Sequence, residues 1–157
     1  MTEERKGLVQ IYTGEGKGKT TASLGLALRA LGHNMSVYMI QFMKGGDTGE
    51  MFAIQKYLPN FHLVQFGKDA LKEKQMKIVS FDSEEKKQNF LTEEERYVFF
   101  SDKVETDPSK MGFEHAERIV NSGEYDLVIL DELNCVLGRD MIPIEDALKL
   151  IKNKPNH

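Results

Sequence analysis

Residues 7–31 read GLVQIYTGEGKGKTTASLGLALRAL, and this stretch decides the fold. It begins with a short apolar run, continues through a glycine-rich turn that contains Lys17 and Lys19, and ends in a repeat of Ala and Leu that opens on Thr20 and Thr21. Glycines allow the backbone to turn tightly with its N–H groups pointing inward, and a helix N-terminus adds partial positive charge on the same side. The stretch therefore predicts a phosphate-binding loop between a strand and a helix.

The turn matches most of the P-loop pattern G-x-x-x-x-G-K-[ST]. Gly18, Lys19 and Thr20 occupy the last three positions, and Thr13 stands where the pattern has its first glycine. We expect the backbone amides of residues 15–20 to surround the phosphates and Lys19 to neutralise the terminal ones. This predicts binding of Mg-ATP or Mg-GTP and does not choose between kinases, ATPases, switches and transferases, because all of them share such loops.

Composition is that of a soluble globular protein with a single domain. The chain has 157 residues, of which 40% are apolar and 29% are charged, with a formal net charge of −4. A negative net charge argues against general binding to nucleic acid. No apolar run approaches the roughly 18 residues of a membrane span, and the first residues do not resemble a signal peptide, so we expect a cytoplasmic protein without a membrane partner.

The few cysteines and histidines do not form a metal-binding pattern. Cys135 is the single cysteine, which excludes an internal disulfide and suits a reducing compartment. We expect it to be a small buried apolar residue rather than a catalytic one. The four histidines are scattered, so each is interpreted as a core or solvated side chain.

Strand-like and helix-like segments alternate along the chain. Residues 8–12, 36–42, 61–66 and 125–130 are predicted strands, and residues 20–31, 50–58, 107–122 and 144–152 are predicted helices. Gly32 and Gly123 are expected to end helices, and Asp107 followed by Pro108 to start one. The alternation predicts an α/β fold of the P-loop NTPase type, with three layers, a mostly parallel sheet and helices on both faces.

Two regions depart from this alternation. Residues 73–107 form a highly charged stretch that we interpret as a solvated helical insertion, with a capping-box signature at Thr92 and Glu95. The chain also ends on a helix, where a doubly wound fold normally returns to the sheet. We therefore interpret residues 1–157 as one nucleotide-binding domain that lacks a C-terminal strand and tail.

Asp131 and Glu132 follow the last predicted strand directly. A carboxylate at the end of a parallel strand, facing a phosphate loop, holds Mg²⁺ directly or through water, and the Thr20 hydroxyl is a further oxygen ligand. Glu132 has three open roles, which are to bind the same metal, to activate a water, or to cap the following turn. We therefore expect Mg²⁺ as the cofactor of this site, and Lys19 and Glu132 are the catalytic candidates.

A glycine-containing loop, residues 44–49, follows the second predicted strand. It lies at the edge where open α/β sheets bind ligands, although its glycines could equally form a plain connection. Lys44 and Glu50 are the candidate substrate contacts there.

Three segments together resemble one family, the P-loop ATP:corrinoid adenosyltransferases. They are TGEGKGKTTASLGLALRALGH at residues 13–33, QFMKG at residues 41–45 and VILDELN at residues 128–134. The resemblance covers most of residues 7–66 and 111–157. Two features depart from it, since the chain has no tryptophan after the third strand and its charged stretch is longer than the family needs.

The resemblance implies an enzyme that finishes the adenosylcobalamin cofactor, in biosynthesis or salvage. Co(I) of a reduced corrinoid attacks the 5′ carbon of ATP, the co-substrate, and intact triphosphate leaves. From the loop and the resemblance together, the nucleotide and metal residues are Thr13, Gly14, Glu15, Gly16, Lys17, Gly18, Lys19, Thr20, Thr21, Arg29, Asp131 and Glu132. Gln41 and Lys44 match family positions and are weaker substrate candidates, and Glu50 is a further candidate from its place after the second predicted strand. The family further suggests a flavoprotein reductant and a homodimer.

Two other functions stay open at the level of the sequence. One is a P-loop nucleotide kinase or ATPase, in which Glu132 would activate a hydroxyl or a water. The other is a nucleotide-dependent binding module without corrinoid activity, which the missing aromatic segment motivates.

Overall fold

The computed structural model describes residues 7–44, 48–67 and 107–156. Its elements along the chain are α1 (Lys19–Gly32), β1 (Val37–Phe42), α2 (Gly49–Tyr57), β2 (Phe61–Phe66), α5 (Pro108–Ser122), β3 (Leu127–Asp131), α6 (Leu133–Leu137) and α7 (Ile144–Asn153). The predicted insertion at 73–107 lies almost entirely outside the described residues.

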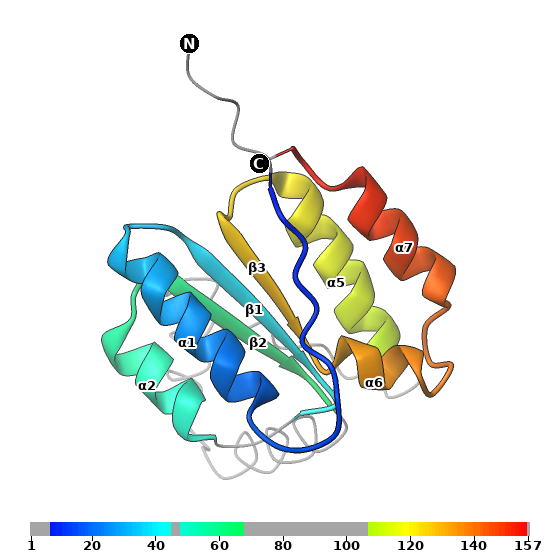
Figure 1. Cartoon of the computed structure of the whole chain (residues 1–157), viewed down its shortest axis with the longest axis horizontal. Helices are drawn as coiled ribbons and strands as arrows, with labels where there is room; N and C mark the ends of the chain where they lie inside the picture. Colours follow the sequence, from blue (N-terminus) through cyan, green and yellow to red (C-terminus); the bar gives the residue numbers. More distant parts are fainter. Residues whose placement is uncertain (1–6, 45–47, 68–106, 157) are drawn as a thin grey trace, which may run out of the picture.

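The three strands form one parallel sheet in the order β2-β1-β3. Helices α1 and α2 cover one face, and α5, α6 and α7 cover the other (Figure 1). All six residues of the central strand β1 are buried, whereas the first four residues of β3 are only partly buried. The predicted three-layer α/β architecture with a parallel sheet is confirmed.

Local capping signals explain where α5 begins and ends. The Asp107 side chain accepts a hydrogen bond from Ser109 N at 2.9 Å, and Pro108 follows at the first helical position. Gly123 ends the helix with φ 66, a left-handed conformation that glycine adopts without a Cβ penalty. The end of α1 differs from the prediction, because Gly32 is still helical and Asn34, with φ 59, takes the left-handed conformation.

The predicted first strand, residues 8–12, is wrong. The structure assigns no strand there, and the three-stranded sheet does not include the segment. Leu8 is 79% exposed and Ile11 is 69% exposed. The apolar pattern is present, but a strand also needs hydrogen bonds to a neighbouring strand, and residues 8–12 pair with none of the three described strands. The segment instead leads from Gly7, whose N–H donates to Asn156 O at 2.6 Å, to the glycine-rich turn.

A buried histidine joins α5 to the sheet on the side away from α1. His115 is 5% exposed, and its Nε2 lies 2.6 Å from the Tyr38 hydroxyl. Its Nδ1 contacts the Arg118 guanidinium, which can only donate, so Nδ1 accepts and the proton of the neutral ring is on Nε2. Burial, followed by the charge of Arg118, lowers the pKa of His115 from 6.5 to about 4.

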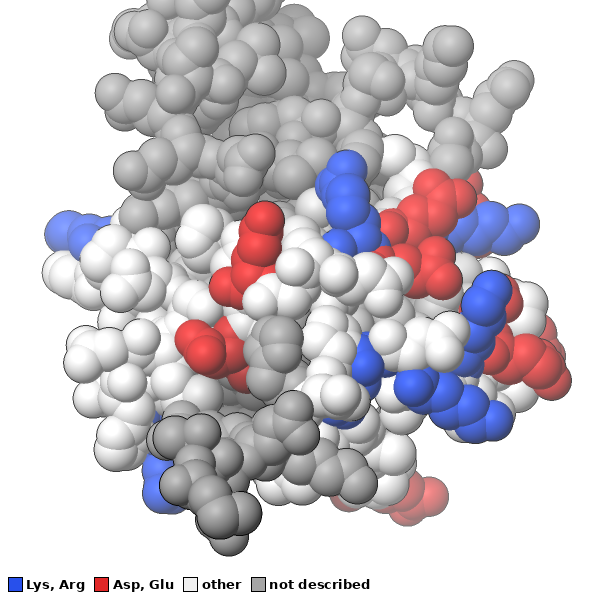
Figure 2. All heavy atoms as spheres, turned by 90° about the horizontal axis from the view of Figure 1, so that it is seen from above, with Lys and Arg blue, Asp and Glu red and all other residues white. Residues whose placement is uncertain are grey.

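Charges of both signs are mixed on the face opposite to the carboxyl ends of the strands. In the view of Figure 2 the Lys and Arg side chains lie beside Asp and Glu, without a large area of one sign. The coloured part of this face therefore shows no row of cations that would suit a phosphate backbone. None of the described helices has the length and apolarity that a membrane crossing requires.

Candidate nucleotide-binding site

Three alternate glycines shape the loop that precedes α1. Gly14, Gly16 and Gly18 have φ values of 124, 105 and 101, which L side chains rarely adopt. This backbone explains the spacing of the glycines in the sequence, because a Cβ at any of the three would be strained. The loop residues 13–18 are exposed, so a ligand can reach them from solvent.

Lys19 folds back across this loop. Its Nζ donates to Gly14 O at 2.8 Å and to Gly16 O at 2.9 Å. The first helical hydrogen bond of α1 runs from Ala22 N to Gly18 O, at 2.8 Å, and no side chain caps the helix. The amides at the start of α1 are therefore available to an anion beside an ammonium group.

A second group of side chains meets at the carboxyl ends of β1 and β3. The Thr20 hydroxyl lies 3.1 Å from each oxygen of Asp131. Lys44 Nζ lies 2.7 Å from Asp131 Oδ2 and 3.0 Å from Thr20 Oγ1. Gln41 Nε2 donates to the same Oδ2 at 3.0 Å. The buried carboxylate of Asp131 is thus held by one cation, one hydroxyl and one amide.

Left-handed residues terminate both of these strands. Met43, directly after β1, has φ 55, and Glu132, directly after β3, has φ 66. A non-glycine residue in this region costs roughly 1–2 kcal/mol, and such strain concentrates at functional sites. The turn at Met43 directs Lys44 back toward Asp131.

Gly67 packs directly against the backbone of Lys44. A Cβ on Gly67 would lie 2.6 Å from Lys44 O, and Met43 N donates to Phe66 O at 2.7 Å. The end of β2 therefore holds the segment that carries Lys44 in place. Gly67 is not among the residues predicted from the sequence, because one glycine after a predicted strand gives no signal for such a close approach.

Glu132 does not join Asp131 in this arrangement. Its Oε2 accepts a hydrogen bond from Cys135 Sγ at 2.9 Å, within the first turn of α6. This hydrogen bond, followed by burial, raises the pKa of the Cys135 thiol. The prediction that Cys135 is buried is wrong, because it lies on the exposed side of the short helix α6.

The other predicted site residues lie at different distances from this centre. Thr13, Glu15, Lys17 and Thr21 are exposed on the loop and the first turn of α1. Arg29 is in the last turn of α1, roughly 15 Å along the helix from Lys19 at 1.5 Å per residue, so the structure does not bring it to the loop. Glu50 is in the first turn of α2, where a carboxylate complements the helix dipole.

Comparison with known proteins adds an independent observation. Residues 5–157 match the family described as ATP:corrinoid adenosyltransferase BtuR/CobO/CobP. The chain belongs to this family. The resemblance of the three sequence segments is thereby confirmed over nearly the whole length.

Similar proteins are identical to this chain at about a quarter of the aligned positions. The corrinoid adenosyltransferase of Escherichia coli K12 is 26% identical over 99% of this chain and 66% of its own length. Corrinoid adenosyltransferase CobA of Salmonella typhimurium LT2 is 28% identical over 100% of this chain and 67% of its own length. An uncharacterized protein of Nostoc, all2391, is 28% identical over 94% of this chain and 35% of its own length. The chain thus spans about two thirds of the length of its adenosyltransferase relatives.

The donor set at Asp131 and Thr20 suits a hard divalent cation. Mg²⁺ prefers carboxylate and hydroxyl oxygens and binds through one or two carboxylates together with substrate phosphates. The Lys44 ammonium already lies between these two oxygens, which shows that they accept positive charge. Within the described part of the chain, no three His, Cys, Asp or Glu side chains cluster, so a cage made of protein ligands alone is not present there.

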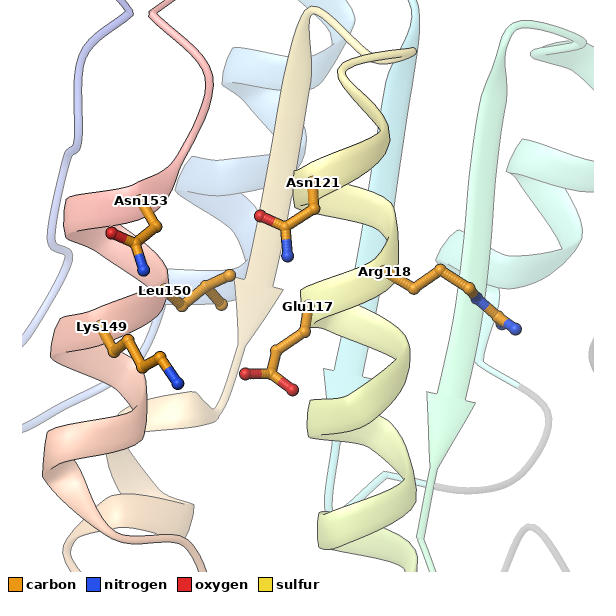
Figure 3. Close-up of a pocket in the computed structure, with 6 residues that line it drawn as sticks. All are labelled: Glu117, Arg118, Asn121, Lys149, Leu150 and Asn153. Atoms are coloured by element: carbon orange, nitrogen blue, oxygen red, sulfur yellow. The ribbon is translucent and has the colours of Figure 1, made fainter.

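An open groove of about 240 Å³ lies elsewhere, between α5 and α7. In Figure 3, Glu117 and Lys149 extend toward one another across it, while Arg118 points away. The groove belongs to the helices on the far side of the sheet from α1. It is therefore separate from the glycine-rich loop.

Proposed function

We propose that this protein transfers the 5′-deoxyadenosyl group of ATP to the Co(I) centre of a corrinoid and releases triphosphate. The observation that carries the proposal is the pairing of the Lys19 loop with the cluster of Thr20, Lys44 and Asp131 at the adjacent strand ends. Membership of the adenosyltransferase family supports the same reaction.

The reaction needs no protein nucleophile. The electron pair of Co(I) forms the new bond to the 5′ carbon, the bond from that carbon to its oxygen breaks, and the triphosphate leaves with those electrons. Catalysis then consists of orienting the ribose carbon and stabilising the charge on the leaving group. A site that offers loop amides and two lysines suits this task.

Each group at the site has a role in this proposal. The loop amides and Lys19 bind the triphosphate, and Lys44 supplies a second cation beside Asp131. Asp131 and Thr20 would hold Mg²⁺, which would add positive charge against the departing triphosphate. Glu132, turned toward Cys135, is left without a base role in this conformation.

The family resemblance also suggests an electron donor and further partners. Because the attacking cobalt must be Co(I), an electron donor is required, and we propose a reduced flavoprotein. We also propose a homodimer, as the family resemblance suggests, and a cytoplasmic location, which suits a reaction that consumes ATP under reducing conditions.

The test is to identify what is released from ATP. Under anaerobic conditions, ATP and a corrinoid reduced to Co(I) should give an adenosylated corrinoid, seen by its light-sensitive absorbance, and one equivalent of triphosphate. Release of ADP or phosphate without cobalt would replace the proposal with a kinase or an ATPase. Tight ATP binding without any corrinoid product would instead indicate a nucleotide-dependent binding module.

A further inference from the structure

The face of the sheet beneath α1 and α2 carries three rows of side chains. Aligned across the three strands, the rows are Val37, Phe61 and Leu127, then Met39, Leu63 and Ile129, then Gln41, Gln65 and Asp131. Residues two apart on a strand point to the same face, so the third row continues the first two. Two apolar rows are therefore followed by one polar row at the end of the sheet nearest the loop.

The polar row is deeply buried and fully connected. Gln41, Gln65 and Asp131 are 0%, 7% and 8% exposed. Gln65 Nε2 donates to Gln41 Oε1 at 2.9 Å, and Gln41 Nε2 donates to Asp131 Oδ2 at 3.0 Å. Burying a side-chain amide costs free energy unless it is hydrogen-bonded. The row therefore indicates that polar side chains are required at this level of the sheet.

The direction of these hydrogen bonds is set by Asp131. An ionised carboxylate only accepts, so Gln41 must turn its NH₂ group toward Asp131. The Gln41 carbonyl then faces Gln65, which must present its own NH₂ group. If Gln65 could not donate, the fully buried carbonyl of Gln41 would lose its partner, and the orientation of the Gln41 amide would no longer be fixed.

We propose that Gln65 is a positioning residue of the triphosphate site. It contacts no ligand itself; it fixes the amide of Gln41, and through that amide it holds Asp131 toward Thr20 and Lys44. This deepens the proposed function and rests on it. Residues of this kind behind a metal ligand typically change metal affinity about 10–100-fold when they are replaced.

The sequence contains a signal that could have located Gln65. The pair Gln-Phe ends both β1, as Gln41-Phe42, and β2, as Gln65-Phe66. A polar residue at the same place near the end of two buried parallel strands indicates that both face one site. Only the strand register shows that the two glutamines are direct neighbours.

The first experiment is calorimetric titration of ATP with and without Mg²⁺. Gln65→Met keeps the side-chain length and removes the donor. We expect it to weaken Mg-ATP binding about tenfold and to leave metal-free ATP binding within about twofold, because the loop and Lys19 do not depend on Asp131. In the Gln41→Met background the same substitution should have no further effect, since Gln65 acts only through Gln41. Gln55→Met, on α2, is the matched control and should bind as the wild type does.

A second measurement needs no nucleotide. The side-chain amide protons of Gln41, observed by NMR, should shift and lose protection from exchange in Gln65→Met. If Gln65→Met does not fold, Gln65→Asn keeps the amide but is one methylene too short to reach, and it should give the same result.

The outcomes separate the two proposals. If the wild type does not bind ATP, the proposed function fails, and the NMR comparison still decides whether Gln65 positions Gln41. Unchanged Gln41 amide signals, or an equal loss of ATP affinity with and without Mg²⁺, would overturn the positioning role.

Discussion

Replacing Lys44 with methionine tests the electrostatic centre of the site. The Lys44 side chain is 26% exposed and that of Asp131 is 7% exposed, with 2.7 Å between Nζ and Oδ2. Removing one partner of a buried pair costs about 3–5 kcal/mol, and an exposed pair contributes about 0.2–1 kcal/mol. With one partner partly exposed, and with Gln41 and Thr20 still bonded to Asp131, we expect a loss of about 2 kcal/mol.

The assay is thermal unfolding followed by circular dichroism at neutral pH. A loss of about 2 kcal/mol corresponds to a Tm lower by roughly 4–8 °C for a domain of this size. Added Mg²⁺ should raise the Tm of Lys44→Met by more than it raises the wild-type Tm. In the variant the ammonium no longer occupies the space between Thr20 Oγ1 and Asp131. Lys110→Met, on the exposed side of α5, is the control and should stay within about 0.5 kcal/mol.

A double-mutant cycle decides whether the effect passes through Asp131. In an Asp131→Asn background, Lys44→Met should change stability by less than about 0.5 kcal/mol, since the charge it neutralises is gone. A wild-type Tm for Lys44→Met, or the same loss in both backgrounds, would refute the reasoning.

Three further outcomes follow from the geometry. Lys19→Ala should weaken ATP binding about 10–100-fold, as a charged hydrogen bond contributes about 1.5–3 kcal/mol; unchanged affinity by calorimetry would rule out the phosphate loop. Gly67→Ala should lower stability by about 1–3 kcal/mol and weaken Mg-ATP binding, because its Cβ would lie 2.6 Å from Lys44 O and displace that residue. A crystal structure of the variant in which Lys44 keeps its wild-type position would contradict this. His115 has a pKa of about 4 in the folded protein and 6.5 as its ordinary value, so the unfolded chain takes up the proton first. Unfolding free energy should therefore be lost as pH falls from about 6.5 to 4, by about 2 kcal/mol after allowance for solvent screening, and a His115→Gln variant should lack this part of the urea-denaturation profile.

Local signals were the part of the fold that the sequence predicted best. The helix Pro108–Ser122 has the predicted bounds to within a residue, because a cap, a proline and a left-handed glycine act within a few positions. The strand Phe61–Phe66 also has its predicted bounds. The loop glycines and the placement of Asp131 at a strand end were likewise readable from spacing.

Features that depend on contact between distant segments were not predictable. The approach of Gly67 to Lys44 and the neighbouring position of Gln41 and Gln65 follow from strand register. The left-handed turn at Met43 has no cue in the residue type, since methionine rarely adopts it. Candidate residues of the site could be selected from the sequence. Their hydrogen-bond network could not, because it depends on these contacts between distant segments.

The edge strand β3 and the segment 8–12 are both more exposed than the central strand β1. Among the described residues β3 pairs only with β1, so no described strand pairs with its other edge. Leu8 and Ile11 are exposed as well. We therefore expect the backbone amides on this edge of β3 to be open to solvent. Hydrogen exchange tests this: alternate amides of β3 should exchange much faster than any amide of β1, which has a neighbour on both sides. Uniformly slow exchange along β3 would mean that its edge is already covered, and the mass of the particle in solution would then show whether a second copy covers it.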